Sequence, residues 1–278
     1  MPENEAHRDH QKNMSFLQHA EDMRWHVIRM LIAIVIGMVG MFLVMDWLIQ
    51  SVILAPLQPD FPMHKLMCSI RESFCFQKLD VSFQATSPTE QFTKAILIAV
   101  VGGFIVAFPY IIWELWRFIK PALGPKEAKN ARWSVFVVSI LFLIGVCFAY
   151  FIILPFTFRF LAEFQLDERI QNIWRIGEVV GLVVQFSLAG GLLFELPILV
   201  YVLSRMGILR PKLMRKYRRH AVIVTLMLAG VLTPSPDILS QILLALPILL
   251  LYELSIGISA RVERKRQKER AAEEAQYV

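Results

Sequence analysis

Six long stretches of this 278-residue chain carry few or no charged residues. They cover residues 30–45, 95–113, 133–154, 179–203, 221–232 and 238–252. A helix rises about 1.5 Å per residue, so about 20 apolar residues span the roughly 30 Å hydrocarbon layer. The third stretch has 22 uncharged residues and is long enough to cross without help. We therefore predict an all-α integral membrane protein with six transmembrane helices.

The fifth and sixth stretches are shorter than a normal bilayer is thick. Only 14 residues lie between Arg219 and Pro234, which is about 21 Å of helix. Either stretch alone would also suit a buried helix of a soluble protein. Because they follow four clear spans, we predict that both cross, with local thinning of the bilayer.

The predicted organisation has three parts. An N-terminal amphipathic segment covers residues 1–29, a transmembrane domain covers 30–259, and a charged tail, frayed or disordered, covers 260–278. The six spans are expected at about 30–48, 93–114, 133–154, 179–203, 219–233 and 238–256. No cleavable signal peptide is expected, because nearly thirty polar residues precede the first apolar stretch.

Composition and charge distribution support a membrane protein with a defined orientation. Hydrophobic residues make up 56% and charged residues 19%, with a mean hydropathy of +0.53, which excludes an ordinary soluble domain. Of the 29 Lys and Arg residues, 22 lie in the N-terminal segment, two alternate loops and the tail, and seven lie in the other loops. The positive-inside rule then predicts that both termini are cytoplasmic. The net charge of +6 is read as this topology signal, and no nucleic-acid partner is expected.

The first external segment contains two cysteines, Cys68 and Cys75, seven residues apart. In an oxidising compartment they could form a disulfide, and two free thiols fit the sequence equally well. Its prolines and aromatic residues predict an ordered cap with short helices.

Enzymatic motifs are missing from the sequence. It has no HExxH, GxSxG, Walker A, glycine-rich dinucleotide turn or CxxC. His7 and His10 could share a helix face and bind a metal, but a solvated tail explains them better. We expect no catalytic residues, metal site or cofactor.

One carboxylate, Glu195, lies inside a predicted span. Placing a charge there costs roughly 2.5–3.5 kcal/mol, so this side chain should face protein or water. Thr233, Gln241 or Gln185 are its expected partners, and Pro197 predicts a kink just after it. Glu195 could capture another helix or line a water-filled groove, or its hydrogen bonds could serve only packing.

Two further acids lie in basic surroundings on the predicted cytoplasmic side. Asp22 precedes the first span, and Glu127 lies in the loop after the second. A carboxylate accepts two parallel N–H bonds from a guanidinium, so a pair of such acids suits a ligand with two arginines.

These features resemble the TatC family, the polytopic receptor subunit of the twin-arginine protein translocase. The resemblance runs from about Ser15 to Arg261. It is carried in order by Ser15-Phe16-Leu17-x-His19 with Arg24; Ala55-Pro56-Leu57; Ser87-Pro88-Thr89-Glu90-x-Phe92; Pro109 with Trp113 and Trp116; Phe118-Ile119-x-Pro121-Ala122-Leu123; Phe148-x-Tyr150-Phe151; Phe194-Glu195-x-Pro197; and Leu232-Thr233-Pro234-Ser235-Pro236-Asp237 followed by Ser240-Gln241.

The resemblance implies a receptor in the bacterial inner membrane. It would bind twin-arginine signal peptides of folded proteins and assemble with the single-span TatA and TatB subunits. Export would be driven by the proton-motive force without a cofactor, in a complex holding several copies of this chain. The helices would form a concave bundle with a periplasmic cap.

By position, the resemblance assigns a signal-peptide site and a partner site. Glu127 matches the glutamate that contacts the arginine pair, and Asp22 stands where the family usually has a second glutamate. Ala20 stands where a leucine is usual, and Glu21 could substitute for Asp22. Arg24, Phe118, Pro121 and Leu123 match the rest of that surface. Glu195, Thr233 and Gln241 match the polar cluster where partner helices dock.

Two other classes of protein compete with this interpretation. A proton-coupled solute transporter using Glu195 explains the intramembrane acid, but explains neither Glu127 nor the lack of inverted repeats. An intramembrane enzyme would need a nucleophile and a base, and the sequence offers no such pair.

Overall fold

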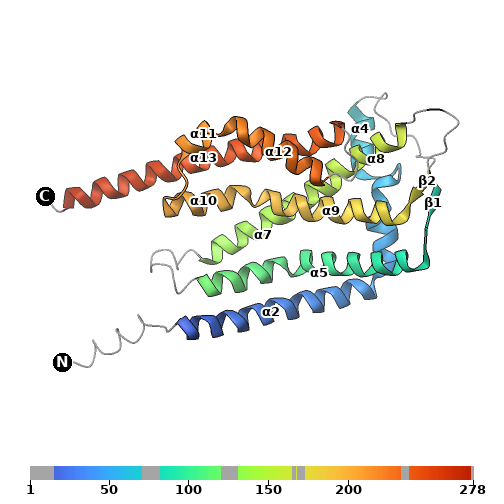
Figure 1. Cartoon of the computed structure of the whole chain (residues 1–278), viewed down its shortest axis with the longest axis horizontal. Coiled ribbons are helices and arrows are strands. Elements are labelled where there is room, and N and C mark those ends of the chain that lie inside the picture. The colour runs from blue at the N-terminus through green and yellow to red at the C-terminus, as the bar shows by residue number, and fades with distance from the viewer. Residues whose placement is uncertain are drawn as a thin grey trace. The chain divides into compact units, whose positions relative to one another are not determined.

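The computed structural model describes residues 16–70, 82–119, 131–164, 167, 173–232 and 238–276. The chain divides into two compact units, each of which is described by itself. The first comprises Met1–Leu43 and Ala99–Ser139, and the second comprises Val44–Ile98 and Ile140–Val278. Helices dominate both units (Figure 1).

Five helical segments among the described residues are long and apolar enough to cross a membrane. They are Met23–Leu43, Pro88–Phe118, Trp133–Glu163, Ile176–Met206 and Leu244–Lys268. The predicted fifth span corresponds to helix α12 (Arg218–Leu232), which has 15 residues and is too short to be counted among them. A largely helical chain with several helices able to span a membrane is thus confirmed, while six spans and the position of the termini stay predictions.

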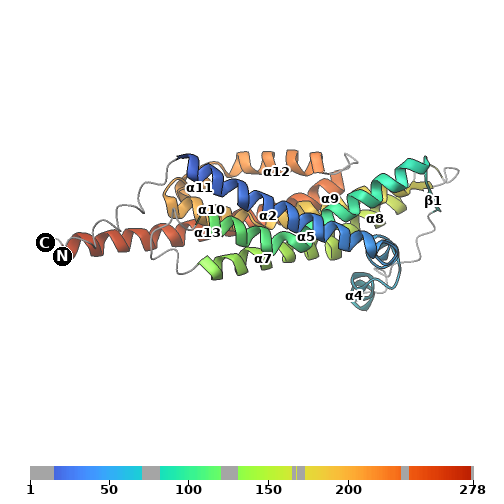
Figure 2. The same ribbon diagram turned by 90° about the horizontal axis from the view of Figure 1, so that it is seen from below.

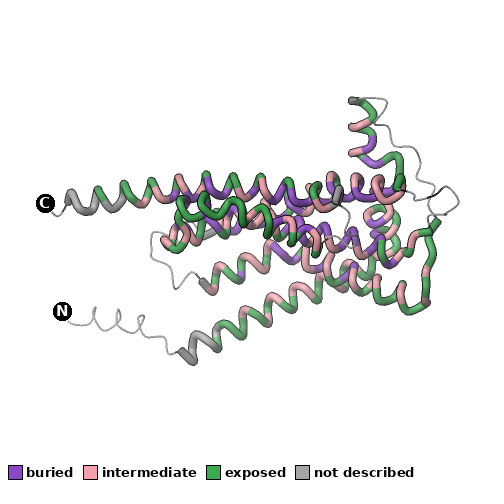
Figure 3. The backbone as a smooth tube through the Cα atoms, turned by 45° about the horizontal axis from the view of Figure 1, so that its top comes forward, coloured by how far each residue is buried: buried purple, intermediate pink, exposed green. Residues whose placement is uncertain are grey.

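The first unit contains α2 (Phe16–Leu43), the part of α5 (Pro88–Ile119) from Ala99 onward, and the start of α7 (Ala131–Phe148). Glycines let the backbones of α2 and α5 touch. A Cβ on Gly37 would lie 2.8 Å from the Gly103 carbonyl oxygen, and a Cβ on Gly103 would collide with the backbone nitrogen of Met38. Membrane helices associate closely through such small residues. The remaining surface of α2 is largely exposed in this unit (Figure 3).

The second unit contains a small parallel sheet that aligns two helices. Strand β1 (Ser82–Gln84) pairs with β2 (Ile173–Arg175), so that Phe83 lies opposite Trp174. Helix α5 starts a few residues after β1, and α9 (Ile176–Phe194) starts directly after β2. The strand pairing therefore fixes the starts of the two helices in register.

Short helices before this sheet pack on the helix that follows α7. They are α3 (Met45–Leu48), the π-helix η1 (Ile49–Ile53), the 3₁₀ helix η2 (Ala55–Leu57) and α4 (Pro62–Ile70). The Tyr150 hydroxyl donates to the Val52 carbonyl at 2.8 Å, and the Phe61 ring contacts Tyr150 and stacks on Phe151. Burial lowers the pKa of His64, whose Nδ1 lies 2.9 Å from the Gln58 carbonyl oxygen. These contacts confirm that ordered short helices, rather than a linker, precede residue 71.

A π-helical turn interrupts the third apolar segment. The turn η5 (Ala149–Ile153) joins α7 to α8 (Leu154–Glu163). Pro155 follows it and has no N–H to donate to the preceding turn. A π turn inserts one extra residue and relieves the resulting mismatch. Ala149, Ile153 and Leu154 are buried at this point.

The fourth segment is interrupted at Glu195. Helix α9 ends at Phe194 and α10 (Leu196–Met206) begins at Leu196, so Glu195 alone separates them. Pro197 cannot bond to the carbonyl four residues earlier, which explains the break. The interruption expected beside Pro197 is therefore present, with the carboxylate at the break itself.

Helix α13 (Ile238–Gln276) continues without a break into the charged tail. A frayed helix or a disordered tail was expected from Arg261, and the structure shows a helix up to Gln276. Buried serines just before the tail help to hold this helix, because Ser204 of α10 donates its hydroxyl to Ser259 Oγ at 2.7 Å. Helices α10 and α13 lie side by side, with α11 (Pro211–Lys216) packed on α13 (Figures 1 and 2).

The glycine contact of the first unit makes a prediction about stability. We expect Gly103→Ala to lower the free energy of unfolding by about 1–3 kcal/mol, because the added methyl collides with the α2 backbone. Gly40→Ala is the matched control, since a Cβ there meets no atom within 4 Å. Thermal unfolding in detergent compares the two variants, and equal melting temperatures would contradict a packing role for Gly103.

Candidate functional site

A buried carboxylate joins α2 to α5 in the first unit. Glu114 Oε2 lies 2.5 Å from His26 Nδ1, and Glu114 Oε1 accepts the Tyr110 hydroxyl at 3.0 Å. The Arg29 and Arg117 guanidinium groups lie 3.8 and 3.9 Å from the same Oε1. Tyr110, Glu114 and Arg117 share one face of α5 because residues three or four apart are neighbours on a helix. We call these five residues the Glu114 cluster.

The other residues of the Glu114 cluster compensate the charge of the Glu114 carboxylate, which would otherwise be costly to bury. Only 2% of Glu114 is exposed, and an isolated charged carboxylate at that depth needs paired charges and hydrogen bonds. Two hydrogen-bond partners and two guanidinium groups supply them.

The structure places some of the residues expected at the signal-peptide surface. Glu21 and Arg24 are exposed on α2, and the Phe118 ring meets the His26 ring edge-on at a centroid distance of 6.0 Å. Asp22 belongs to α2, but its side chain lies outside the described ones. Pro121, Leu123 and Glu127 also lie outside the described residues. Phe118 is therefore the expected residue that the structure connects to the Glu114 cluster.

Sequence reasoning missed Glu114, His26 and Arg29. The second span was expected to end at about residue 114, and Glu114 was given no role. The spacing could have revealed the cluster, because Tyr110, Glu114, Arg117 and Phe118 are spaced so that they share one face of a helix. His26 and Arg29 likewise stand three residues apart near the start of the first apolar stretch.

The second expected site surrounds Glu195 in the second unit. Glu195 Oε1 is buried and, among the described residues, has no hydrogen-bond partner. Gln241 instead donates its amide to the Leu226 carbonyl at 2.6 Å, which ties α13 to α12. Gln185 lines a separate pocket together with Lys94 and Arg175. Thr233 lies outside the described residues, so its relation to Glu195 stays a prediction.

The cysteines and possible metal ligands add little to either site. Cys68 is disulfide-bonded and Cys147 is a free thiol, while Cys75 lies outside the described residues. The described part of the chain contains no group of three His, Cys, Asp or Glu side chains placed to hold a metal ion.

Comparison with known proteins gives one consistent family. The family model described as "Sec-independent protein translocase protein (TatC)" matches residues 18–247. The chain is 32% identical to the Sec-independent protein translocase protein TatC of Blattabacterium sp. subsp. Periplaneta americana, with 93% of this chain and 100% of the relative covered. It is 34% identical to the protein of that name from Carboxydothermus hydrogenoformans, with 91% and 96% covered.

Solved structures agree with the sequence relatives. A crystal structure of a Twin Arginine Translocase Receptor, TatC, superposes with a TM-score of 0.71 at 28% identity. The match covers 88% of this chain and 99% of that one. A second crystal structure, of the receptor in the detergent DDM, superposes with a TM-score of 0.72.

The Glu114 cluster makes a second prediction. We expect Glu114→Ala to destabilise the protein by about 2–3 kcal/mol, because it removes charge-assisted hydrogen bonds and leaves two arginines without their acid. Glu163→Ala is the control, since that exposed acid pairs with Arg159 at 2.7 Å and such pairs contribute about 0.5 kcal/mol. Denaturation in detergent measures both, and equal losses would show that the cluster is an ordinary surface ion pair.

Proposed function

Because the chain belongs to the TatC family of Sec-independent protein translocase proteins, we propose that it binds the twin-arginine signal peptides of folded proteins. Family membership makes it a component of twin-arginine translocation. We further propose that it receives the cargo and assembles with TatA, TatB and further copies of itself. It acts without a cofactor, and the proton-motive force drives export.

One observation supports the receptor role above the others. The solved relative, which is matched over nearly its whole length, is itself described as a twin-arginine translocase receptor. The 28% identity and the TM-score of 0.71 mean that corresponding helices of the two proteins can present a similar surface to a signal peptide. The proton-coupled transporter using Glu195 is not favoured, because the relatives described above include no solute transporter.

Carboxylates provide the chemistry that two adjacent arginines require. Glu127 and Asp22 are proposed to accept the paired N–H groups of the ligand, with Glu21 as a second acid beside Asp22. Glu21 is exposed and therefore accessible to a ligand. Arg24, Phe118, Pro121 and Leu123 are proposed to complete the surface around the peptide.

The Glu114 cluster is proposed to position the residues of this site. It holds α2 and α5 together one or two turns from Glu21 and Phe118 on the same helices. The cluster therefore limits how far the acids of α2 can move relative to the end of α5. Its own acid is saturated by partners, so it is suited to positioning and not to direct capture of arginine.

The topology proposed for this function has six spans and both termini in the cytoplasm of a bacterium. The 22 to seven distribution of basic residues supports it. Helix α12 would be the fifth span, crossing where the bilayer is thinned. Glu127 and Asp22 then face the compartment in which folded cargo is made.

Glu195 is proposed to receive a partner helix together with Thr233 and Gln241. Its buried Oε1 has no hydrogen-bond partner among the described residues, and an unpaired buried acceptor is costly. A polar group from a TatA or TatB helix would satisfy it.

A third prediction tests the recognition site. Glu127→Ala should weaken binding of a twin-arginine peptide by more than about 2 kcal/mol, the scale of a lost charge-assisted bidentate contact. Binding of a labelled peptide to the purified protein measures the effect. Glu178→Ala, an exposed acid in the first turn of α9, is the control. Unchanged affinity in Glu127→Ala, or equal affinity for a peptide with two lysines, would remove Glu127 from the site.

A fourth prediction separates assembly from recognition. Glu195→Ala should leave peptide binding intact but impair export of a folded cargo, because the partner helix loses its polar contact. Export into the periplasm and co-purification of the single-span subunits are measured in the same cells. Normal export by the variant would mean that Glu195 serves packing alone.

A further inference from the structure

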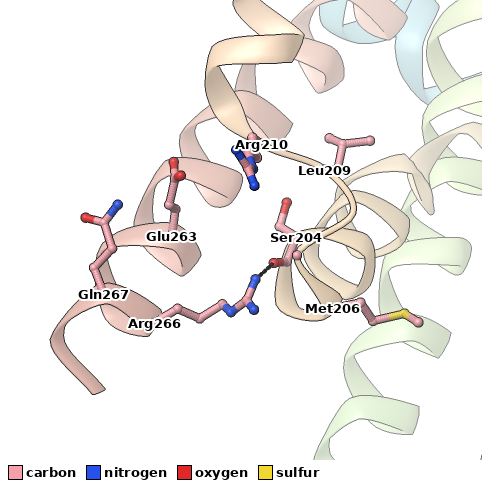
Figure 4. Close-up of a pocket in the computed structure, with 8 residues that line it drawn as sticks. Ser204, Met206, Leu209, Arg210, Glu263, Arg266 and Gln267 are labelled. Carbon is pink, nitrogen blue, oxygen red and sulfur yellow. Dashed lines mark hydrogen bonds between the residues drawn. The ribbon is translucent and has the colours of Figure 1, made fainter. Parts of the chain in front are cut away.

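A basic pocket lies where α10 ends, beside the charged part of α13. It has a volume of about 480 Å³ and is lined by Ser204, Met206, Gly207, Leu209, Arg210, Glu263, Arg266 and Gln267. Figure 4 shows Arg210 on the loop after α10 and Arg266 on α13, on different sides of the hollow. None of these residues belongs to the Glu114 cluster or to the site around Glu195.

Arg266 is held in place on one wall of this pocket. Its Nη1 donates to the Ser204 carbonyl at 3.3 Å, and its guanidinium lies against Gly207. Gly207 has a left-handed φ of 84°, and a Cβ there would collide with Arg266 Nη1. Both the turn and the close approach therefore require glycine, and the guanidinium is preorganised.

Arg210 is available for a ligand. No described residue forms a hydrogen bond or an ion pair with its guanidinium, and it is exposed to the pocket. The segment 204–219 contains seven basic residues and no acid. Glu263 is the one acid among the lining residues, so the two arginines leave the lining with net positive charge.

The pocket lies where the apolar parts of two candidate membrane spans give way to charged residues, as expected at the level of lipid headgroups. Helix α10 ends the candidate span Ile176–Met206, and α13 becomes charged from Arg261 onward within the candidate span Leu244–Lys268. Beside the pocket, Met206 and Ile208 are 64% and 62% exposed. Basic pockets between transmembrane helices at this level bind the headgroups of anionic lipids.

We propose that this pocket binds the phosphate of an anionic phospholipid, with Arg210 and Arg266 contacting the phosphate oxygens. The acyl chains then lie on the exposed apolar side chains of Met206 and Ile208. Guanidinium groups suit phosphate oxygens because both offer paired hydrogen-bonding positions. The site is independent of signal-peptide binding and extends the function proposed above.

Native mass spectrometry of the full-length protein in detergent tests the site. Phosphatidylglycerol should be retained in preference to phosphatidylcholine, and Arg210→Gln should weaken its retention about fivefold, which corresponds to about 1 kcal/mol per arginine near a membrane surface. Arg266→Gln should act in the same direction. The control is Arg264→Gln, an exposed arginine of α13 that does not line the pocket, and it should bind normally.

Three outcomes would overturn the proposal. Equal weakening by Arg264→Gln would mean that general surface charge attracts the lipid. Displacement of the lipid by millimolar inorganic phosphate would mean that a free anion is the ligand, and displacement by a soluble acidic peptide would mean that the pocket is a protein contact. Arg210 is on an exposed loop, so an unchanged melting temperature of Arg210→Gln is the check that lost binding is not lost folding.

Discussion

Contact between helix backbones at glycine is the interaction on which the packing of both units depends. In the first unit Gly37 and Gly103 bring α2 against α5, and in the second Gly145 and Gly190 bring α7 against α9. Lipid tails are as apolar as the side chains they solvate, so burying leucine gives little drive for helices to associate in a bilayer. Van der Waals contact between closely approaching backbones has to supply the driving force for helix association. Helix α2 illustrates this, because the apolar window of its span is not buried at all within the structure.

The two interior carboxylates show how environment divides roles between the same functional groups. Glu114 has a histidine, a tyrosine hydroxyl and two arginines around it, and the contacts cross from one helix to another. Glu195 lies at a helix break with a buried oxygen that no described residue satisfies. A carboxylate whose hydrogen-bonding positions are filled holds two helices rigidly together. A carboxylate with an unpaired oxygen favours binding of a further polar group. Both are glutamates near or within apolar helices, and their neighbouring groups decide whether each joins helices or is left to bind a further group.

Much of the fold could be predicted from the chain because long uncharged stretches leave a helix few alternatives in a membrane. The break at Glu195 also followed from Pro197. Contacts between distant segments could not be predicted in the same way. Glu114 was given no role, because hydropathy marks where apolar residues end and does not tell which residues of another helix lie beside them. For the tail from Arg261 the alternatives of a frayed helix and a disordered segment stayed open for a related reason, since the charged composition gave no sign that Ser259 and Val262 are buried. Of the candidate site, Glu127 and Asp22 stood out as acids in basic surroundings and the resemblance assigned their role, while the Glu114 cluster emerged only from the packing of α2 on α5.

The π turn at Ala149–Ile153 has a geometric consequence for the helix that contains it. One extra residue in a turn advances the helical phase by about 100°, so side chains beyond Ile153 no longer continue the stripe that begins on α7. The π turn itself packs on α9 and reaches α4, whereas α8 beyond it packs mainly on η2. One continuous helical segment therefore uses different faces for its contacts at the turn and beyond it. Deleting one residue from this turn would restore a regular α-helix, and it would rotate α8 away from its partners without removing any of the side chains that make the contacts.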